Sequence, residues 1–330
     1  AVKLLWILSI LTFFFSAVLD NLTTAIVMAA LLGKIIKDRQ QLLFFAGIMI
    51  LSANAGGAWS PIGDITTIML WVGGQITLNI VQAIIIPSLV CMIVPLVYVS
   101  FKYRGVVIER PAIKSEDKAN EVIPYERNLL FILGVLGLLF VPVFKTVTHL
   151  PPYLGMLLSL GVLWTVTEII HRNKDKKQKH SLTVVGALSK IEASTIFFFL
   201  GILLAVGSLQ STGILNSLAN ILDDVFNGNL YIINIFIGFL SAILDNVPLV
   251  AGAMGMYEIK ATGDFAVDGV FWEFLAYCAG TGGSLLVIGS AAGVAVMGIL
   301  RINFIWYIKN ISFLALIGYL SGAVTFILLQ

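Results

Sequence analysis

Long apolar runs dominate this chain, and polar residues interrupt them at only a few places. Stretches such as 131–144 and 194–209 are apolar on every helical face, which is typical of helices that cross a membrane. A transmembrane barrel would instead need segments of about ten residues that alternate between apolar and polar. The mean hydropathy of +1.00 and the charged content of 12% agree with the helical interpretation. The sequence therefore predicts an all-α membrane protein, integral and multi-pass, of the bacterial inner-membrane type.

One pattern of apolar and polar residues occurs twice. Residues 14–21 (FFSAVLDN) and 239–246 (FLSAILDN) are identical at six of eight positions, at an offset of 225 residues. The segment 56–64 (GGAWSPIGD) returns at 282–290 (GGSLLVIGS), at an offset of 226 residues. Two elements that repeat in the same order at nearly the same offset indicate a duplicated architecture.

Each LDN motif predicts a re-entrant hairpin. Residues 4–33 form one apolar segment that is interrupted at Asp20-Asn21. As a straight helix, at about 1.5 Å per residue, this segment would span roughly 45 Å, whereas the hydrocarbon core is roughly 30 Å thick. Each arm alone is too short to cross, so a hairpin whose tip lies at membrane depth fits better. Residues 230–258 repeat this pattern around the second LDN motif.

Each hairpin precedes a discontinuous transmembrane helix. Glycine, proline and small polar residues at 52–64 divide the apolar segment 42–73, and residues 279–290 divide the segment 271–300 in the same way. The half-helix ends and freed backbone groups of such helices can coordinate a small ion. The other apolar segments predict helices at 78–101, 129–144, 153–170, 194–209 and 303–329, and an interfacial amphipathic piece at 211–228.

The charged loops predict the topology and the domain organisation. Basic residues gather in 34–40, 102–127 and 171–190. The positive-inside rule places all three segments in the cytoplasm, and the number of crossings between them agrees. The second hairpin then enters from the outside, so the two repeats have inverted topology. We assign residues 1–101 to the first repeat, 102–127 to a cytoplasmic loop and 128–330 to the second repeat.

The two repeats are not equally complete. Three predicted crossings precede the second hairpin, whereas no crossing precedes the first. We therefore expect either that further helices precede Ala1 in the native protein or that the symmetry is partial.

Three acidic residues, Asp20, Asp64 and Asp245, are predicted to lie at membrane depth. A carboxylate there costs several kcal/mol unless it is paired, protonated or bound to a cation, so each marks a candidate functional site. A simpler interpretation is that a carboxylate caps a helix, and Asp64 is placed to cap the second half-helix. We predict that the three aspartates bind Na⁺ and protons together with the neighbouring Asn21 and Asn246.

Neutral oxygen donors accompany these carboxylates and are predicted to support a bound cation. They are Thr23, Thr24, Ser52, Asn54, Ser60, Thr281, Ser284 and Ser290. For any one serine or threonine, a hydrogen bond to its own helix backbone is the more common role.

Basic residues are missing from the segments that carry the two motifs. Residues 4–33, 41–86, 230–257 and 274–300 contain neither Lys nor Arg. An anion pocket could still use helix N-termini, but it would hardly carry three acidic residues. A cation is therefore the expected substrate.

Several other classes of function lack support in the sequence. No metal-type Cys/His spacing or phosphate-binding glycine loop is present, and Cys91 and Cys278 lie in apolar stretches, where a thiol behaves as a small hydrophobic group. We therefore expect no enzymatic activity, no cofactor and no nucleic-acid partner. The lipid bilayer is the expected surrounding.

The motifs resemble those of NhaD-type sodium/proton antiporters in the ion transporter superfamily. The resemblance rests on SAVLDNLTT, SANAGGAWSPIGD, LDNVP and GTGGS, and it covers nearly the whole chain. Anion-carrying relatives place Ser-Asn-Thr at the hairpin tips, where this chain has Leu-Asp-Asn. The resemblance implies a scaffold domain, a mobile domain of hairpins and broken helices, and a homodimer.

Three functions follow as hypotheses. The first is secondary active exchange of Na⁺, and of Li⁺ as a second cation, for H⁺ by alternating access. Two carboxylates near one ion cannot both stay charged cheaply without it, so the empty site should hold a proton that cation entry expels. The second is transport of an anion or oxyanion, such as a dicarboxylate or arsenite, on the same scaffold. The third is a channel-like or purely structural membrane protein.

Overall fold

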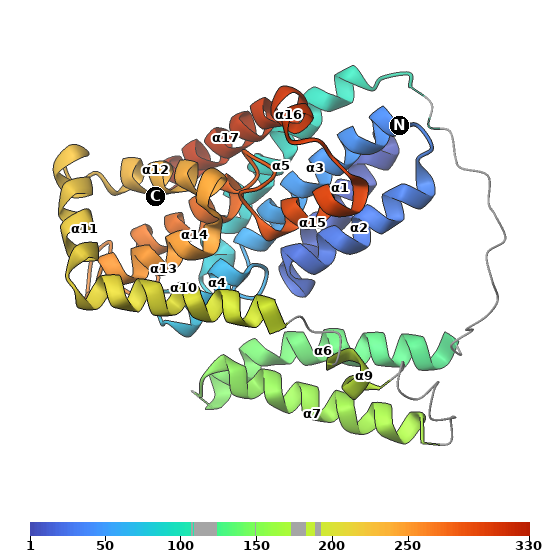
Figure 1. Ribbon diagram of the computed structural model, residues 1–330, viewed down its shortest axis with the longest axis horizontal. Coiled ribbons are helices and arrows are strands. Elements are labelled where there is room, and N and C mark those ends of the chain that lie inside the picture. The colour runs from blue at the N-terminus through green and yellow to red at the C-terminus, as the bar shows by residue number, and fades with distance from the viewer. Residues whose placement is uncertain (107, 109–123, 149, 173–182, 189–192) are drawn as a thin grey trace. The chain divides into compact units, whose positions relative to one another are not determined.

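The computed structural model describes residues 1–106, 108, 124–148, 150–172, 183–188 and 193–330. Within these ranges all regular elements are helices (Figure 1). Six of them are long and apolar enough to cross a membrane, or up to seven if one bent pair forms a single span. The predicted all-α, multi-pass membrane fold is confirmed. Most of the expected loop 102–127 and of the basic segment 171–190 lies outside the described residues.

The chain forms two compact units. The first comprises Ala1–Ala112 and Ile202–Gln330, and the second comprises Ile113–Gly201. Both LDN motifs and both glycine-rich breaks belong to the first unit. The candidate site therefore lies within a single unit.

Both LDN motifs form the tips of hairpins. The first hairpin consists of α1 (Val2–Leu19) and α2 (Asn21–Ile35), and the second of α12 (Leu230–Leu244) and α13 (Asn246–Met256). A single aspartate separates the two helices of each hairpin, and the paired helices contact each other. The second arms are roughly 23 and 17 Å long, too short to cross a hydrocarbon core of roughly 30 Å. The first arm α1, with 18 residues, is by itself long and apolar enough to cross, so the expectation that each arm is too short is wrong for α1. The two helices joined by one aspartate agree with the predicted hairpins in both repeats.

The discontinuous helices consist of α3 (Arg39–Ala58) with α4 (Ile65–Val72), and of α14 (Val270–Gly282) with α15 (Ala291–Leu300). The first half of each continues further than the sequence indicated, so the breaks shrink to 59–64 and 283–290. The reason is close packing: a backbone carbonyl of α1 occupies the space that a Cβ on Gly56 would need, and a carbonyl of α12 does so at Gly282. These glycines serve helix contact rather than chain breaks.

The repeated sequence makes repeated contacts. α1 packs on α3 as α12 packs on α14. The hydroxyl of Ser16 donates to the carbonyl of Ala53 at 2.5 Å, and the hydroxyl of Ser241 donates to the carbonyl of Ala279 at 2.9 Å. These two bonds join the same positions of the two repeats, which supports their common architecture.

The two repeats also interlock. α2 of the first hairpin packs against α15 of the second broken helix, and α13 of the second hairpin packs against α4 of the first. α3 contacts α14 between them. Residues of both repeats therefore meet around the breaks.

Polar contacts tie the broken helices together at the ends that lie away from the breaks. Arg39 at the start of α3 donates to the carbonyl of Leu300 at the end of α15, at 2.5 Å. A cation at a helix C-terminus is favourable. Asp268, which precedes α14, accepts from the backbone and hydroxyl of Thr77 at 2.5 Å each and from Asn79 at 3.0 Å, beyond the end of α4. Hydrogen bonds thus join the two broken helices at both of their outer ends.

The last apolar segment differs from the predicted helix 303–329. It contains a short helix, α16 (Phe304–Tyr307), a π-helical turn at Ile308–Ser312, and α17 (Phe313–Leu329). α17 packs along α5 (Ile80–Lys102) and also contacts α14. A π-helical turn has no signature in the apolar pattern, because the buried residues on either side keep a nearly helical spacing.

α10 (Ala193–Ser211) and α11 (Ile214–Val225) form the bent pair. The helices meet at 77°, and Gly213 at the bend has a φ of 76°, which glycine adopts without strain. The interfacial piece expected at 211–228 corresponds to α11.

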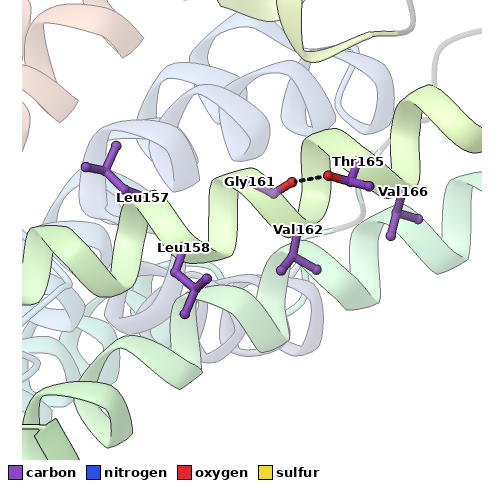
Figure 2. Close-up of a pocket in the computed structure, with 6 residues that line it drawn as sticks. All are labelled: Leu157, Leu158, Gly161, Val162, Thr165 and Val166. Atoms are coloured by element: carbon purple, nitrogen blue, oxygen red, sulfur yellow. Dashed lines mark hydrogen bonds between the residues drawn. The ribbon is translucent and has the colours of Figure 1, made fainter.

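The second unit is formed by α6 (Pro124–Thr148), α7 (Pro152–Ile170) and α9 (Val184–Leu188). α7 carries an open groove of about 450 Å³ (Figure 2). Its lining consists of Leu157, Leu158, Gly161, Val162, Thr165 and Val166. The Thr165 hydroxyl donates to the Gly161 carbonyl at 2.8 Å, within the helix. Because no titratable side chain lines this groove, it is not a candidate cation site.

Candidate cation site

Both hairpin tips place an aspartate in a strained backbone conformation. The φ angle is 69° at Asp20 and at Asp245, with ψ angles of 161° and 147°. Residues other than glycine rarely adopt this conformation, which costs about 1–3 kcal/mol. Each aspartate ends one helix and caps the next: Asp20 accepts from the backbone N–H of Thr23 at 2.6 Å, and Asp245 from that of Asn246 at 2.7 Å. Such strain, present twice, marks the two tips as functional candidates.

Asp64 lies at the centre of a buried hydrogen-bond network. Its side chain is only 1% exposed. It accepts from the side-chain amide of Asn21 in the first hairpin tip. It also accepts from the side-chain amide of Asn246 in the second tip, at 3.3 Å to each carboxylate oxygen. The asparagines of both LDN motifs therefore converge on one carboxylate.

Asp64 caps α4 at the same time. One of its carboxylate oxygens accepts from the backbone and the hydroxyl of Thr66, both at 2.9 Å, and Thr67 completes a capping box. The capping interpretation considered from the sequence is therefore correct for Asp64, but it does not exclude ligand binding. Thr66 and Thr67 were not among the predicted donors. Their spacing behind an aspartate at a helix start is the signal that could have identified them.

Asn54 connects the two breaks. Its side-chain amide donates to the hydroxyls of Ser284 and Ser290, both at 2.9 Å, and its side-chain oxygen accepts from Asn21 at 3.2 Å. All four side chains are buried. Through Asn54, the polar network around Asp64 extends into the second repeat.

The remaining predicted oxygen donors have different roles. The hydroxyls of Ser52 and Thr281 donate to carbonyls one turn back in their own helices, at 2.9 and 2.6 Å, which is the common role of such residues. Thr23 is exposed and donates to the neighbouring aspartate at 3.0 Å. Ser60 accepts from the backbone inside the first break. Thr24 is buried without a hydrogen-bond partner among the described residues, which leaves its hydroxyl available to a ligand.

The charge of this region is negative. The charges of Asp245 and Asp20 both act on Asp64, and both side chains are half-buried. Neither hairpin tip and neither break contains Lys or Arg. We call this group, formed by the three aspartates, Asn21, Asn54 and Asn246, the candidate cation site.

Interlocked hairpins and broken helices around a buried carboxylate define a class of multi-pass membrane proteins, the ion transporters built from inverted repeats. A family model described as "Citrate transporter" matches residues 1–274. The chain is 46% identical to "Sodium/proton antiporter 1" of Arabidopsis thaliana and 43% identical to "Sodium/proton antiporter 2", over 98% of its length in each case. It is 32% identical to "Na(+)/H(+) antiporter NhaD" of Vibrio parahaemolyticus over 92% of its length.

The chain therefore belongs to the citrate-transporter family and, within it, to the NhaD-type sodium/proton antiporters, as the motifs indicated. It covers 55% and 76% of the two Arabidopsis proteins and 75% of the Vibrio protein. The chain thus spans about half the length of the first of these relatives. Since the relatives are transporters, the expectation that this chain is not an enzyme is supported.

Proposed function

We propose that this chain exchanges Na⁺ for H⁺ across the membrane as a secondary antiporter. The observation that carries the proposal is the convergence of Asn21 and Asn246, from two separate hairpins, on the buried carboxylate of Asp64. Oxygen donors of this kind suit a hard monovalent cation, and an uncompensated carboxylate at membrane depth is expensive without one. The names of the relatives support the same function.

Transport of a dicarboxylate or oxyanion is the second candidate, because the family model carries the name of a citrate transporter. Four helices begin at the tips and breaks, and helix N-termini favour anions. Three of these N-termini already have carboxylate caps, from Asp20, Asp64 and Asp245, and the fourth is capped by the hydroxyl of Ser290. The caps satisfy the helix ends and add negative charge. This arrangement favours a cation over an anion.

The asparagines can serve both states of the site. A side-chain amide carries two donors on nitrogen and an acceptor oxygen. With Asp64 charged and no cation bound, Asn21 and Asn246 donate to it. When Na⁺ binds to the carboxylate, rotation of either amide brings its oxygen toward the ion. The same two residues thereby compensate the charge of Asp64 in one state and complete the ligand shell in the other.

Competition supplies the coupling. Na⁺ and protons share Asp20, Asp64 and Asp245, so binding of one weakens binding of the other. Release of Na⁺ on one side leaves carboxylates that take up protons before the site turns to the other side. Net exchange follows because neither the doubly occupied nor the empty, fully charged site is favourable. Li⁺, a smaller cation of the same charge, is expected as a second substrate.

Alternating access is the transport mechanism of this proposal, and the packing of the repeats supports it. Each hairpin packs on a broken helix of its own repeat and on a half-helix of the other. The contacts of Arg39 and Asp268 join the broken helices at both ends. The hairpins and broken helices can therefore move as one body, which exposes the site to either side without a continuous pore.

The test is Na⁺-induced dissipation of a preset pH gradient in proteoliposomes. We expect the gradient to collapse on addition of Na⁺ or Li⁺, and to persist on addition of citrate or arsenite. The Asp64→Asn variant should lose the response, whereas the matched variant Asp224→Asn, which changes an exposed aspartate outside the site, should keep it. Collapse of the gradient by citrate but not by Na⁺ would establish the anion function instead.

A further inference from the structure

Tyr307 is fully buried at the end of α16, and its hydroxyl faces the second break. It donates to the backbone carbonyl of Ser284 at 2.9 Å. Ser284 lies in the non-helical segment 283–290, where the backbone is not fixed by a regular helical ladder. A hydrogen bond from a buried side chain therefore has a larger share in fixing this backbone than it would have inside a helix.

The carbonyl that Tyr307 holds belongs to a residue of the polar network. The hydroxyl of Ser284 accepts from the amide of Asn54 at 2.9 Å. The side-chain oxygen of Asn54 accepts from Asn21, which also donates to Asp64. Four hydrogen bonds in series thus connect Tyr307 to the carboxylate of Asp64.

The segment that follows Tyr307 contacts the other broken helix. The π-helical turn Ile308–Ser312 begins at the next residue. Within it, the side chain of Ile311 fills the space beside Gly47 in α3, so that a Cβ there would lie about 2.5 Å from it. The hydroxyl of Ser312 is buried without a partner among the described residues. π-helical turns of this kind are frequent at functional sites.

We propose that Tyr307 is a positioning residue of the candidate cation site. Its hydroxyl fixes the Ser284 backbone so that the hydroxyls of Ser284 and Ser290 stay on the amide of Asn54. Without this bond the backbone of residues 283–290 can move. Asn54 then loses its fixed position, and with it the hydrogen bond that orients Asn21 toward Asp64. The proposal rests on the proposed function in so far as the bound ligand is Na⁺. The claim that Tyr307 fixes the backbone of residues 283–290 does not depend on which ligand binds.

Tyr319 provides a matched control. It is equally buried, and its hydroxyl also donates to a backbone carbonyl, that of Ile235, at 3.0 Å. Ile235 lies inside α12, where the helical ladder already fixes the backbone. Tyr319→Phe and Tyr307→Phe therefore remove the same atom from two buried side chains. The Tyr319 hydroxyl also contacts the Cys278 thiol in α14, so both of its partners lie inside helices, whereas the partner of Tyr307 lies in the non-helical break.

The functional experiment compares the two variants in proteoliposomes over a range of Na⁺ concentrations. Loss of one neutral hydrogen bond corresponds to a change of about tenfold in an equilibrium constant. Tyr307→Phe should raise the half-saturating Na⁺ concentration by about that factor while the maximal rate changes by less than about twofold. Tyr319→Phe should leave half-saturation unchanged. Equal shifts in both variants, or no shift in Tyr307→Phe, would overturn the proposal.

A rescue experiment removes the possibility that the ring merely packs differently. Incorporation of 3-fluorotyrosine at position 307 keeps a hydroxyl donor, so half-saturation should stay within about twofold of the native value. If this protein shows the same loss as Tyr307→Phe, the hydroxyl is not the cause and the proposal is wrong. If Tyr307→Phe fails to reach the membrane, 4-fluorophenylalanine at position 307, which fills the space of the hydroxyl but donates no hydrogen bond, should raise half-saturation about tenfold instead, and a native value would overturn the proposal.

Backbone hydrogen exchange separates this inference from the proposed function. In purified protein without Na⁺, Tyr307→Phe should speed the exchange of amides in 283–290, whereas Tyr319→Phe should not. If the native protein shows no response to Na⁺ but the exchange difference is present, the antiport function fails and the positioning role stands. If exchange in 283–290 is the same in all three proteins, the positioning role fails whatever the transport assay shows.

Discussion

Asn246 donates its side-chain amide to both carboxylate oxygens of Asp64, at 3.3 Å each, across 182 residues of sequence. Asn21 reaches the same carboxylate from the opposite hairpin. Asp64 has no acidic counterpart, because Ser290 occupies the equivalent position of the second repeat. The candidate cation site is therefore built by both repeats around a residue that only one of them supplies.

Replacement of either tip aspartate should stop exchange. Asp20→Asn and Asp245→Asn each remove a charge and a proton-binding group, so we expect the Na⁺-driven proton flux to fall at least about a hundredfold. Asp224→Asn should retain the native rate. The measurement is fluorescence of a trapped pH indicator in proteoliposomes. Coupled exchange in both tip variants would refute a mechanism of shared carboxylates.

Apparent Na⁺ affinity should fall as the pH falls. At lower pH the shared carboxylates carry protons more of the time, and a protonated carboxyl group binds Na⁺ poorly. Where one proton competes with one Na⁺, the half-saturating concentration should rise by about tenfold for each pH unit. Transport rates at several Na⁺ concentrations and pH values test this. A half-saturating concentration that does not depend on pH would show that Na⁺ and H⁺ bind at separate groups.

The strained backbone at the hairpin tips predicts that a glycine variant is more stable than an alanine variant. At Asp20, glycine should give a more stable protein than alanine by about 1–2 kcal/mol, because only glycine adopts a φ of 69° without strain. Thermal unfolding of the purified variants measures the difference. Part of it reflects helix capping, where glycine also exceeds alanine.

Asp38 provides the control for capping. It caps α3 with an ordinary φ of −70°, so the difference between Asp38→Gly and Asp38→Ala reports capping alone. The difference at Asp20 should be the larger one. Equal differences at both positions would mean that the backbone at the hairpin tip is not strained.

The inverted topology predicts labelling from opposite faces. A single cysteine at Lys34, after the first hairpin, should react only with a reagent on the cytoplasmic side, and one at Asp264, after the second hairpin, only with a reagent outside. Both positions are exposed. The native protein is the control, because Cys91 and Cys278 are buried. Labelling of both positions from one side would disprove the inverted arrangement.

The architecture could be predicted because a polar residue stands out in the apolar sequence of a membrane-embedded helix. An aspartate in an apolar run, as at Asp20, has few explanations other than a break, and the recurrence of the motif at Asp245 made the pattern specific. The ends of the half-helices were less predictable. A glycine such as Gly56 allows either a break or a close helix contact, and only the position of α1 decides between them.

Individual ligands were harder to predict than the site itself. Ser52 and Ser284 are similar residues in similar polar segments, yet the first bonds its own helix and the second accepts from Asn54. The difference depends on which way each side chain points, and sequence spacing does not fix that direction when a helix is interrupted nearby. The sequence did not identify Tyr307 either, because an aromatic residue in an apolar helix usually has only a packing role, and its hydrogen bond to Ser284 is visible only in the structure.

The interlocking of the repeats has a consequence for biosynthesis. α4 and Asp64 leave the ribosome well before α13 and Asn246, which at about 5–20 residues per second corresponds to roughly 10–40 s. During this interval the newly inserted first repeat must keep a carboxylate near the bilayer without its later partner. Its helices can reach their final packing only after nearly the whole chain has been made. A nascent chain arrested before the second hairpin should therefore depend on membrane chaperones and be a preferred substrate for membrane proteases.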